Sequence, residues 1–473
     1  MSTKSEILRK CWAVVSLILI LSLLLGLAAC NKATTLPPAP TTEVQATKPV
    51  ATAGNQSTTT KPFEGVTITT LQETVPDLNY WRDQLPDFEA KTGIKVIVEE
   101  VTYAGMHEKL VPQLSLPAGQ GAYDVIEVDK QWVGEFVCAD WLTPIGDYVA
   151  RDNFDTSVYI PALWEMIGSV YGTTYMLPYY QYSMGLVYRT DIFNDPVLQK
   201  EYERLYNVPL KVPESVDEYA QVAKFLTRDT NGDGEVDQYG TAMQLARFPS
   251  YGEYSHLLFG LDGWYYDSNW NAAVNDEKGM HAIDVLLDLA KNATTPAATG
   301  YNFDEQVALF SQGNAAMIIT YSPMPPVLDN PANSQVAGKL GLAVTPGGHG
   351  MQGGWGWAIP KSAPNPEAAW EFLKWVESFD VAKKRGLAGG GITRTDVFDD
   401  AEVMAKYPWQ AAIKEWIATG KPFPIFCGSQ QLIDILSLNV SQALAGEKDP
   451  HQAMDDAAVE MNKIVKGDPL LNK

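Results

Sequence analysis

The chain has 473 residues, of which 46% are hydrophobic and 11% aromatic, and its formal net charge is −22. A surface this acidic repels polyanions, so binding to nucleic acid or to anionic lipid headgroups is not expected. Four cysteines in a chain of this length do not form a disulfide framework. The composition therefore indicates a globular protein with enough apolar residues for a large core.

The first thirty residues carry the pattern of an export signal. Positive charges such as Lys4 and Lys10 precede an apolar run over residues 12–27. This run is short for a membrane-spanning helix and favours a secretory signal peptide over residues 1–29. The run ends in the string Leu-Ala-Ala-Cys at Cys30, which resembles the bacterial lipobox, and that resemblance implies cleavage and lipidation of Cys30. The alternative is an uncleaved N-terminal membrane anchor.

The segment after the signal has the composition of a tether. Residues 30–62 are mostly Thr, Ala, Pro, Ser, Gln and Val. Such a segment cannot bury enough apolar surface to offset its ordering entropy, so residues 30–62 are expected to form a lipidated, flexible linker. Outside the signal and the anchor only Cys138 and Cys427 remain, and the sequence leaves open whether they pair.

The remaining chain is too long for one ordinary core, so two domains are expected. Its first part alternates between two periodicities. Residues 65–71, 94–101 and 122–128 read as strands, and apolar residues at helical spacing over 78–88 and 106–116 lie between them. This β-α-β-α-β order is typical of a parallel sheet covered by helices, and it predicts the α/β fold class.

One loop carries the oxygen ligands of a calcium site. The segment from Asp229 to Asp237 resembles positions 1 to 9 of an EF-hand loop, with Gly234 where the chain turns sharply. The candidate ligands are Asp229, Asn231, Asp233, the carbonyl of Glu235, and Asp237. Position 12 is Gly240 instead of the usual glutamate, so only a modest affinity for a structural calcium ion is expected. The alternative is a solvated turn.

Several blocks of sequence resemble one family in its order along the chain. They are residues 123–129, 132–145, 175–180, 185–193, 310–317, 353–356 and 367–373. Together they are similar to the extracellular solute-binding proteins of carbohydrate ABC transporters, the maltose-binding protein superfamily. The resemblance implies a non-enzymatic, monomeric protein that binds a carbohydrate and passes it to a membrane permease. With the lipobox, it implies a protein held by lipid at the extracellular or periplasmic face of the cell membrane.

The resemblance also implies a two-lobed fold with a ligand cleft between the lobes. Residues 63–178 and 310–352 are expected to form the first lobe. The second lobe is expected to comprise residues 182–309 and 360–473. Residues 179–181 and 353–359 are the expected hinge crossings.

Candidate ligand contacts follow from the chemistry of sugars, which need aromatic faces beside groups that donate and accept hydrogen bonds. Asp129 ends a predicted strand, where ligands bind in open α/β sheets, and Gln131 and Trp132 follow it. The alternative role for Asp129 is to cap the next helix. Trp355 lies between glycines, which are expected to expose its ring, and the family has a stacking tryptophan in this block.

Further candidates come from the expected crossings and from the family pattern. Tyr179, Tyr180 and Gln181 lie in the first crossing. The resemblance adds Tyr321 and Arg394, and Gln72 and Glu73 follow the first predicted strand.

Two other functions remain open on the sequence alone. A pair of glycosidase carboxylates could lie among the 57 acidic residues, which would make the chain a secreted, lipid-anchored carbohydrate-active enzyme. A binding protein for another solute, such as a polyamine or an oligopeptide, is the second alternative. Against an enzyme, no pair of the five histidines has metal-ligand helix spacing, and no Gly-x-Ser-x-Gly elbow occurs.

Overall fold

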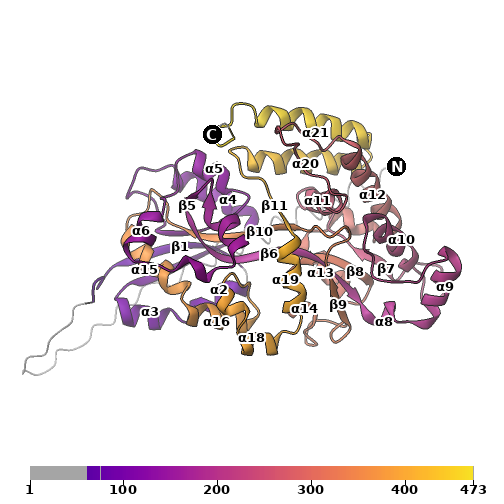
Figure 1. Cartoon of the computed structure of the whole chain (residues 1–473), viewed down its shortest axis with the longest axis horizontal. Helices are drawn as coiled ribbons and strands as arrows, with labels where there is room; N and C mark the ends of the chain where they lie inside the picture. Colours follow the sequence, from indigo (N-terminus) through magenta and orange to yellow (C-terminus); the bar gives the residue numbers. More distant parts are fainter. Residues whose placement is uncertain (1–60, 75, 472–473) are drawn as a thin grey trace, which may run out of the picture. The chain divides into compact units, whose positions relative to one another are not determined.

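The computed structural model describes residues 61–74 and 76–471. These residues belong to one compact unit (Figure 1). The predicted signal peptide, Cys30 and all but the end of the predicted linker lie outside the described residues. Among the described helices, none combines the length and the apolar character needed to cross a bilayer.

A nine-stranded mixed sheet runs through this unit, with the strand order β2-β1-β3-β10-β6-β8-β7 and with β9 and β11 beside β6 and β10. The strands are β1 (Thr67–Glu73), β2 (Lys95–Val101), β3 (Val125–Asp129), β6 (Met176–Arg189), β7 (Tyr239–Ala242), β8 (Ala315–Tyr321), β9 (Leu340–Ala343), β10 (Met351–Ala358) and β11 (Lys421–Pro422). A separate ribbon consists of β4 (Ser169–Val170) and β5 (Thr173–Thr174).

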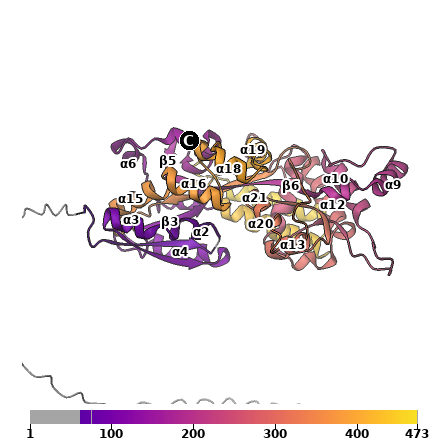
Figure 2. The ribbon, with the colours of Figure 1, turned by 90° about the horizontal axis from the view of Figure 1, so that it is seen from below.

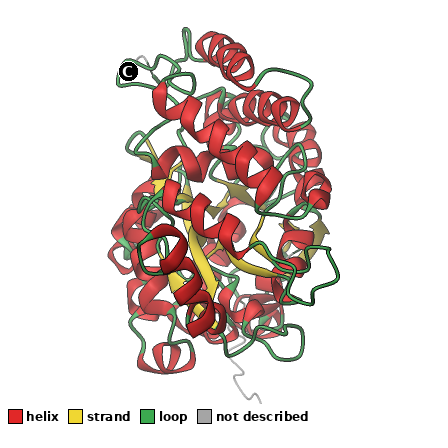
Figure 3. Cartoon of the chain, turned by 90° about the vertical axis from the view of Figure 1, so that its right-hand side faces the viewer, coloured by secondary structure: helices red, strands yellow, loops and turns green. Residues whose placement is uncertain are grey.

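Helices cover the sheet (Figure 3). The α-helices are α2 (Pro76–Arg82), α3 (Leu85–Thr92), α4 (Tyr103–Leu114), α5 (Val133–Cys138), α6 (Gly146–Arg151), α7 (Pro161–Leu163), α8 (Thr190–Phe193), α9 (Pro196–Tyr206), α10 (Val216–Leu226), α11 (Ser250–Gly260), α12 (Glu277–Asn292), α13 (Phe303–Ser311), α14 (Pro325–Leu328), α15 (Pro366–Val376), α16 (Phe379–Ala388), α17 (Thr395–Phe398), α18 (Ala401–Lys406), α19 (Gln410–Thr419), α20 (Ser429–Leu444) and α21 (Pro450–Ile464). Short helical turns are η1 (Thr156–Val158), η2 (Trp164–Gly168) and η3 (Pro296–Gly300).

The α/β class predicted from the periodicity is confirmed. The three predicted strands are β1, β2 and β3, and β1 pairs in parallel with both of the others. The predicted helix over 78–88 is two helices, α2 and α3, which meet at residues 83–84. Both keep the apolar residues that the pattern picked out, because Trp81 and Phe88 are fully buried against Phe372 of α15.

The strand pairing divides the unit into two bodies. Body 1 consists of residues 61–74, 76–174 and 359–406, and body 2 of residues 190–350 and 423–464. Strands β6 and β10 cross between them, pairing with each other from Gln352↔Ser183 to Ala358↔Met176. Figure 2 shows β6 passing from the helices around α2 and α15 to those around α10 and α13. A third crossing runs through α19 and β11.

The expected lobe limits need a correction. Residues 310–350 belong to body 2, because β8 pairs with the second half of β6 and with β7, and β9 pairs with β6. Residues 351–352 begin the crossing strand β10. Residues 360–406 belong to body 1, where Trp370 of α15 packs against Tyr148 and donates its indole N–H to Asp152, 2.8 Å away. The expected crossing at 179–181 lies within β6, and all but the last residue of the expected crossing at 353–359 lies within β10.

Candidate functional site

The two long crossing strands direct tyrosines and a tryptophan toward the junction of the bodies. On β6, Tyr180 pairs with Trp355 and Tyr182 pairs with Gly353. Side chains alternate along a strand, so Tyr180 and Tyr182 lie on one face and Gln181 lies on the other. Gly353 is required there, because a side chain at that position would overlap the ring of Tyr182.

Asp129, at the end of β3, accepts two tyrosine hydroxyls at this junction. The hydroxyl of Tyr103 donates to Oδ2 over 3.0 Å, and that of Tyr182 donates to Oδ1 over 2.9 Å. Only 2% of Asp129 is exposed. Burial raises the pKa of Asp129 to about 6, although the hydrogen bonds from Tyr182, Gln131 and Tyr103 act in the opposite direction. Asp129 therefore titrates at a mildly acidic pH.

Aromatic rings and an amide complete the group around Asp129. Trp132 stacks on Tyr103 with the ring centroids 5.3 Å apart, and it meets Trp355 edge to face at 5.5 Å. The amide of Gln131 donates to the hydroxyl of Tyr251 over 2.9 Å. We call this set the Asp129 cluster, and its members are Tyr103, Asp129, Gln131, Trp132, Tyr180, Tyr182, Phe248, Tyr251 and Trp355.

Both bodies contribute to the Asp129 cluster. Asp129, Gln131 and Trp132 come from body 1, whereas Tyr251 of α11 comes from body 2. Phe248, just before α11, lies 5.9 Å from the ring of Tyr103 and is 42% exposed. A site shared by two bodies can be opened and closed by their relative motion. Aromatic faces beside a carboxylate and an amide suit a small polar ligand that also has an apolar face.

Trp355 belongs to the cluster, but the expected exposure of its ring is wrong. The side chain is 3% exposed and is enclosed by Tyr103, Trp132 and Tyr180. The neighbouring glycines make room for other residues instead of for solvent. A side chain at Gly354 would collide with Ile167, just as one at Gly353 would collide with Tyr182.

Three predicted contacts lie elsewhere. Tyr179 is fully buried in body 1, where its hydroxyl accepts the indole N–H of Trp81 over 3.1 Å and its ring lies 4.2 Å from that of Trp357. Its position follows from a register shift, since the pairing with β10 passes from Tyr180 directly to Pro178.

Gln181 accepts the hydroxyl of Ser183 over 3.0 Å and faces a cavity of about 20 Å³ that the segment 389–392 also lines. Arg394 donates to the carbonyl of Glu377 over 2.7 Å and forms an ion pair with Asp396 at 2.7 Å. The structure therefore gives both residues structural partners outside the Asp129 cluster.

Of the remaining predicted residues, Tyr180 belongs to the cluster, and Glu73 and Tyr321 contact its members. The hydroxyl of Tyr180 donates to Glu73 over 3.3 Å, while the backbone N–H of Glu73 donates to Glu127. Gln72 is 1% exposed and its amide donates to Thr70. Tyr321, the last residue of β8, meets Tyr182 edge to face at 5.5 Å. The alternative cap role of Asp129 is not seen, since α5 begins after Trp132 without a side-chain cap.

Sequence reasoning missed Tyr103, Tyr182, Phe248 and Tyr251. Side chains two residues apart on a strand lie on the same face, so the prediction of Tyr180 could have been extended to Tyr182. Nothing local marks Tyr103 or Tyr251, because their positions depend on how α4 and α11 pack against the sheet.

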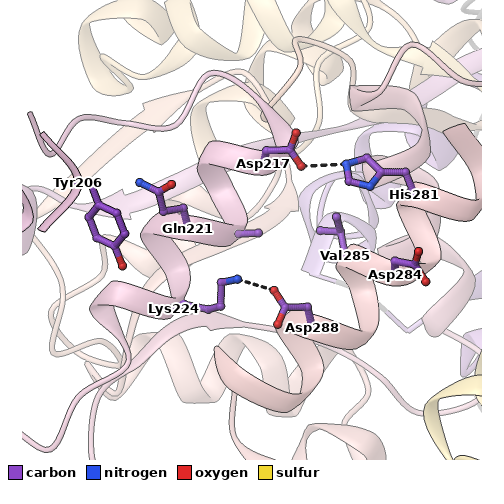
Figure 4. A pocket seen from close by; sticks show the side chains of 9 residues that line it. Tyr206, Asp217, Gln221, Lys224, His281, Asp284, Val285 and Asp288 are labelled. Carbon is purple, nitrogen blue, oxygen red and sulfur yellow. Dashed lines mark hydrogen bonds and ion pairs between the residues drawn. The ribbon is translucent and has the colours of Figure 1, made fainter. Parts of the chain in front are cut away.

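Another cavity also lies outside the cluster. It has a volume of about 510 Å³ and lies in body 2 between α10 and α12. Figure 4 shows Asp217 directed toward His281 and Lys224 toward Asp288, at 2.8 and 2.6 Å. These side chains are already paired across the groove, and none belongs to the Asp129 cluster.

The predicted calcium loop folds its oxygen atoms inward. The carboxylate of Asp229 accepts the N–H groups of Gly232 and Gly234 over 2.6 and 2.8 Å, which lowers the pKa of Asp229. Asp237 accepts the N–H of Thr230 over 2.8 Å. Gly240 cannot be a glutamate here, because any side chain would overlap the backbone of Ala223 in α10. The donor atoms suit a hard cation, and calcium binding stays a prediction.

Comparison with known proteins establishes the family. Residues 72–383, more than half of the chain, match the family described as "Bacterial extracellular solute-binding protein", and the chain belongs to this family. It is therefore a solute-binding protein of an ABC transporter, extracellular or periplasmic, and the family is not enzymatic. The carbohydrate-active enzyme considered from the sequence is thereby set aside.

Among curated relatives, a probable amino-acid ABC transporter periplasmic-binding protein of Sinorhizobium fredii is 23% identical over 86% of this chain and 91% of its own. A mannitol-binding protein of Pseudomonas aeruginosa is 25% identical over 66% of this chain and 69% of its own. Among solved structures, an ABC transporter solute-binding protein of Agrobacterium radiobacter in complex with ribitol has a TM-score of 0.73 and 26% identity, covering 85% of this chain and all of the other. One from Thermotoga lettingae bound with α-D-tagatose has a TM-score of 0.70 and 27% identity, covering 84% and 99%.

Proposed function

We propose that this protein captures a carbohydrate, either a sugar or a related polyol, in the Asp129 cluster and delivers it to the permease of an ABC transporter. The observation that carries the proposal is a buried carboxylate whose hydrogen bonds come from tyrosine hydroxyls and backbone N–H groups, between aromatic rings from both bodies. Sugar hydroxyls can replace the tyrosine hydroxyls, and the C–H face of a sugar can stack on a ring.

The names of relatives support the same class of ligand. The relatives include a mannitol-binding protein and structures in complex with ribitol and with tagatose. One relative carries the name of a probable amino-acid transporter component, which makes an amino acid the second candidate. An amino acid would need a partner for its ammonium group, and Asp129, ionised above a pH of about 6, could supply it.

A thermal-shift screen would separate the two candidates. A ligand that binds only the folded protein raises the melting temperature by mass action. The panel should contain monosaccharides, pentitols and hexitols, short oligosaccharides, amino acids and polyamines, each at the same concentration and ionic strength. We expect a shift for a sugar or polyol, followed by a defined stoichiometry in calorimetric titration. A shift confined to amino acids or polyamines would overturn the carbohydrate assignment.

We further infer that Cys30 carries a lipid that holds the protein at the membrane surface. The inference rests on the lipobox-like string and on the linker composition of residues 30–62. Cys30→Ser is expected to release the protein into the medium or to leave it unprocessed. Mass spectrometry of the wild-type N-terminus checks this directly, and an unmodified Cys30 or a retained signal would contradict it.

A further inference from the structure

A disulfide joins the two bodies. Cys138, the last residue of α5 in body 1, is bonded to Cys427, just before α20 in body 2, with the Cα atoms 5.6 Å apart. The two cysteines are 289 residues apart in sequence, with β6 and β10 between them. The bodies are therefore linked by three crossings of the chain, through β6, β10 and the α19–β11 segment, and in addition by this bond.

The segment around Cys427 contacts both bodies. The carbonyl of Ile425 accepts the hydroxyl of Tyr171 from body 1 over 2.8 Å. Gly134 of α5 packs directly on the backbone of Phe426, so closely that a side chain at Gly134 would overlap it. The ring of Phe426 instead packs within body 2, 5.9 Å from Tyr266 and 5.8 Å from Trp270.

One short helix separates the disulfide from the Asp129 cluster. Helix α5 begins directly after Trp132 and ends at Cys138. At 1.5 Å per residue, these six residues extend about 9 Å from the cluster. Separation of the bodies at the Asp129 cluster would therefore pull on the disulfide and on the contact between Gly134 and Phe426.

We propose that the Cys138–Cys427 disulfide is a redox-sensitive link that limits how far the two bodies separate and thereby sets the rate of ligand exchange. The part concerning ligand rests on the function proposed above. Both cysteines are partly exposed, so a dithiol can reach the bond. In the reaction, two electrons from the dithiol cleave the S–S bond, both sulfurs become thiols, and the dithiol becomes its own disulfide. Reduction leaves β6, β10 and α19 as the links between the bodies.

The first test measures separation of the bodies without ligand. Mature protein would be compared before and after treatment with a dithiol by small-angle scattering, with alkylation and mass spectrometry to count free thiols and circular dichroism to establish that the fold is retained. We expect the radius of gyration to increase on reduction. The Cys138→Ser/Cys427→Ser variant should match the reduced protein and not respond to the dithiol. If this variant fails to fold, the reduced wild-type protein still provides the comparison.

The second test measures exchange of the sugar or polyol found in the screen, by stopped-flow tryptophan fluorescence. Ligand enters only when the bodies are apart, so we expect association and dissociation to become roughly tenfold faster after reduction. An unchanged radius of gyration together with unchanged rates, in protein shown to be reduced and folded, would overturn the proposal. Because scattering needs no ligand, failure to bind any sugar would count against the proposed function without affecting the first test.

Discussion

Two buried carboxylates, Asp129 in the cluster and Glu377 in body 1, show how the proposed ligand site differs from a core. Both are at least 98% buried, and burial raises the pKa of each. Glu377 forms an ion pair with Arg385 at 2.9 Å and accepts the indole N–H of Trp357 over 2.9 Å. Asp129 instead has hydroxyl and backbone N–H partners.

The comparison shows that burial alone does not identify the site. Trp355 and Trp357 are two residues apart on β10, with exposures of 3% and 0%. The rings around Trp357, including Trp81 and Phe372, come from body 1 and β6, whereas those around Trp355 belong to a cluster that body 2 completes. Two features distinguish the cluster from the core. Its side chains come from both bodies, and the hydrogen bonds of its carboxylate come from tyrosine hydroxyls and backbone N–H groups instead of from a charged side chain.

The largest expected effect comes from breaking the ion pair of Glu377. Glu377→Gln leaves the buried guanidinium of Arg385 without its counter-charge, and removing one partner of a buried pair costs about 3–5 kcal/mol of unfolding free energy. Urea unfolding monitored by circular dichroism checks this. Ligand affinity, measured on folded protein, should stay within twofold of wild type. A large loss of affinity with normal stability would remove the distinction between the two carboxylates.

A smaller effect is expected from truncating Trp355. Trp355→Ala removes the ring against which Tyr103, Trp132 and Tyr180 of the cluster pack, and it should weaken ligand binding by about 1–3 kcal/mol, or roughly tenfold to a hundredfold. Trp357→Ala is the matched control on the same strand, and it should lower stability by about 3–5 kcal/mol with little change in affinity. Calorimetric titration beside urea unfolding checks both. Equal affinity of Trp355→Ala and wild type would mean that the ligand does not bind at the cluster.

The third prediction uses the titration of Asp129. Its folded pKa of about 6 lies above the ordinary value, so between the two values the folded state binds more protons than the unfolded state. The contribution of Asp129 to stability is therefore present at low pH and is lost as the pH rises from about 4 to about 6. A carboxylate accepts stronger hydrogen bonds than a neutral acid, so ligand affinity should change in the opposite direction and fall as the pH is lowered through 6.

Asp129→Asn should flatten both pH profiles. Melting temperature and calorimetric affinity would be measured from pH 4.5 to 8 for the two proteins. A wild-type affinity that does not change across pH 6 would show that the ligand does not bond to Asp129.

The sequence predicted those features of the fold and the site that depend on a local pattern of residues. The end of β3 was predictable, and with it Asp129, Gln131 and Trp132, because a buried strand followed by polar residues is a local pattern. The division into two bodies could not be predicted, because nothing in the sequence of residues 315–321 shows that β8 pairs with β6 and β7. Tyr251 and Cys427 each meet a partner more than a hundred residues away, and no spacing encodes such a meeting.

The smallest expected effect concerns the predicted calcium loop, which lies between α10 and β7 in body 2. Asp229, Asp233, Glu235 and Asp237 are exposed or half-buried and lie within nine residues, so their charges repel one another until a cation binds. Chelator should lower the melting temperature of wild-type protein by about 2 °C, and Asp233→Ala should remove that difference. None of these residues belongs to the Asp129 cluster, so ligand affinity should not respond to chelator. Differential scanning calorimetry with and without chelator checks the first point. If wild type and Asp233→Ala both melt at the same temperature in calcium and in chelator, the loop is a solvated turn.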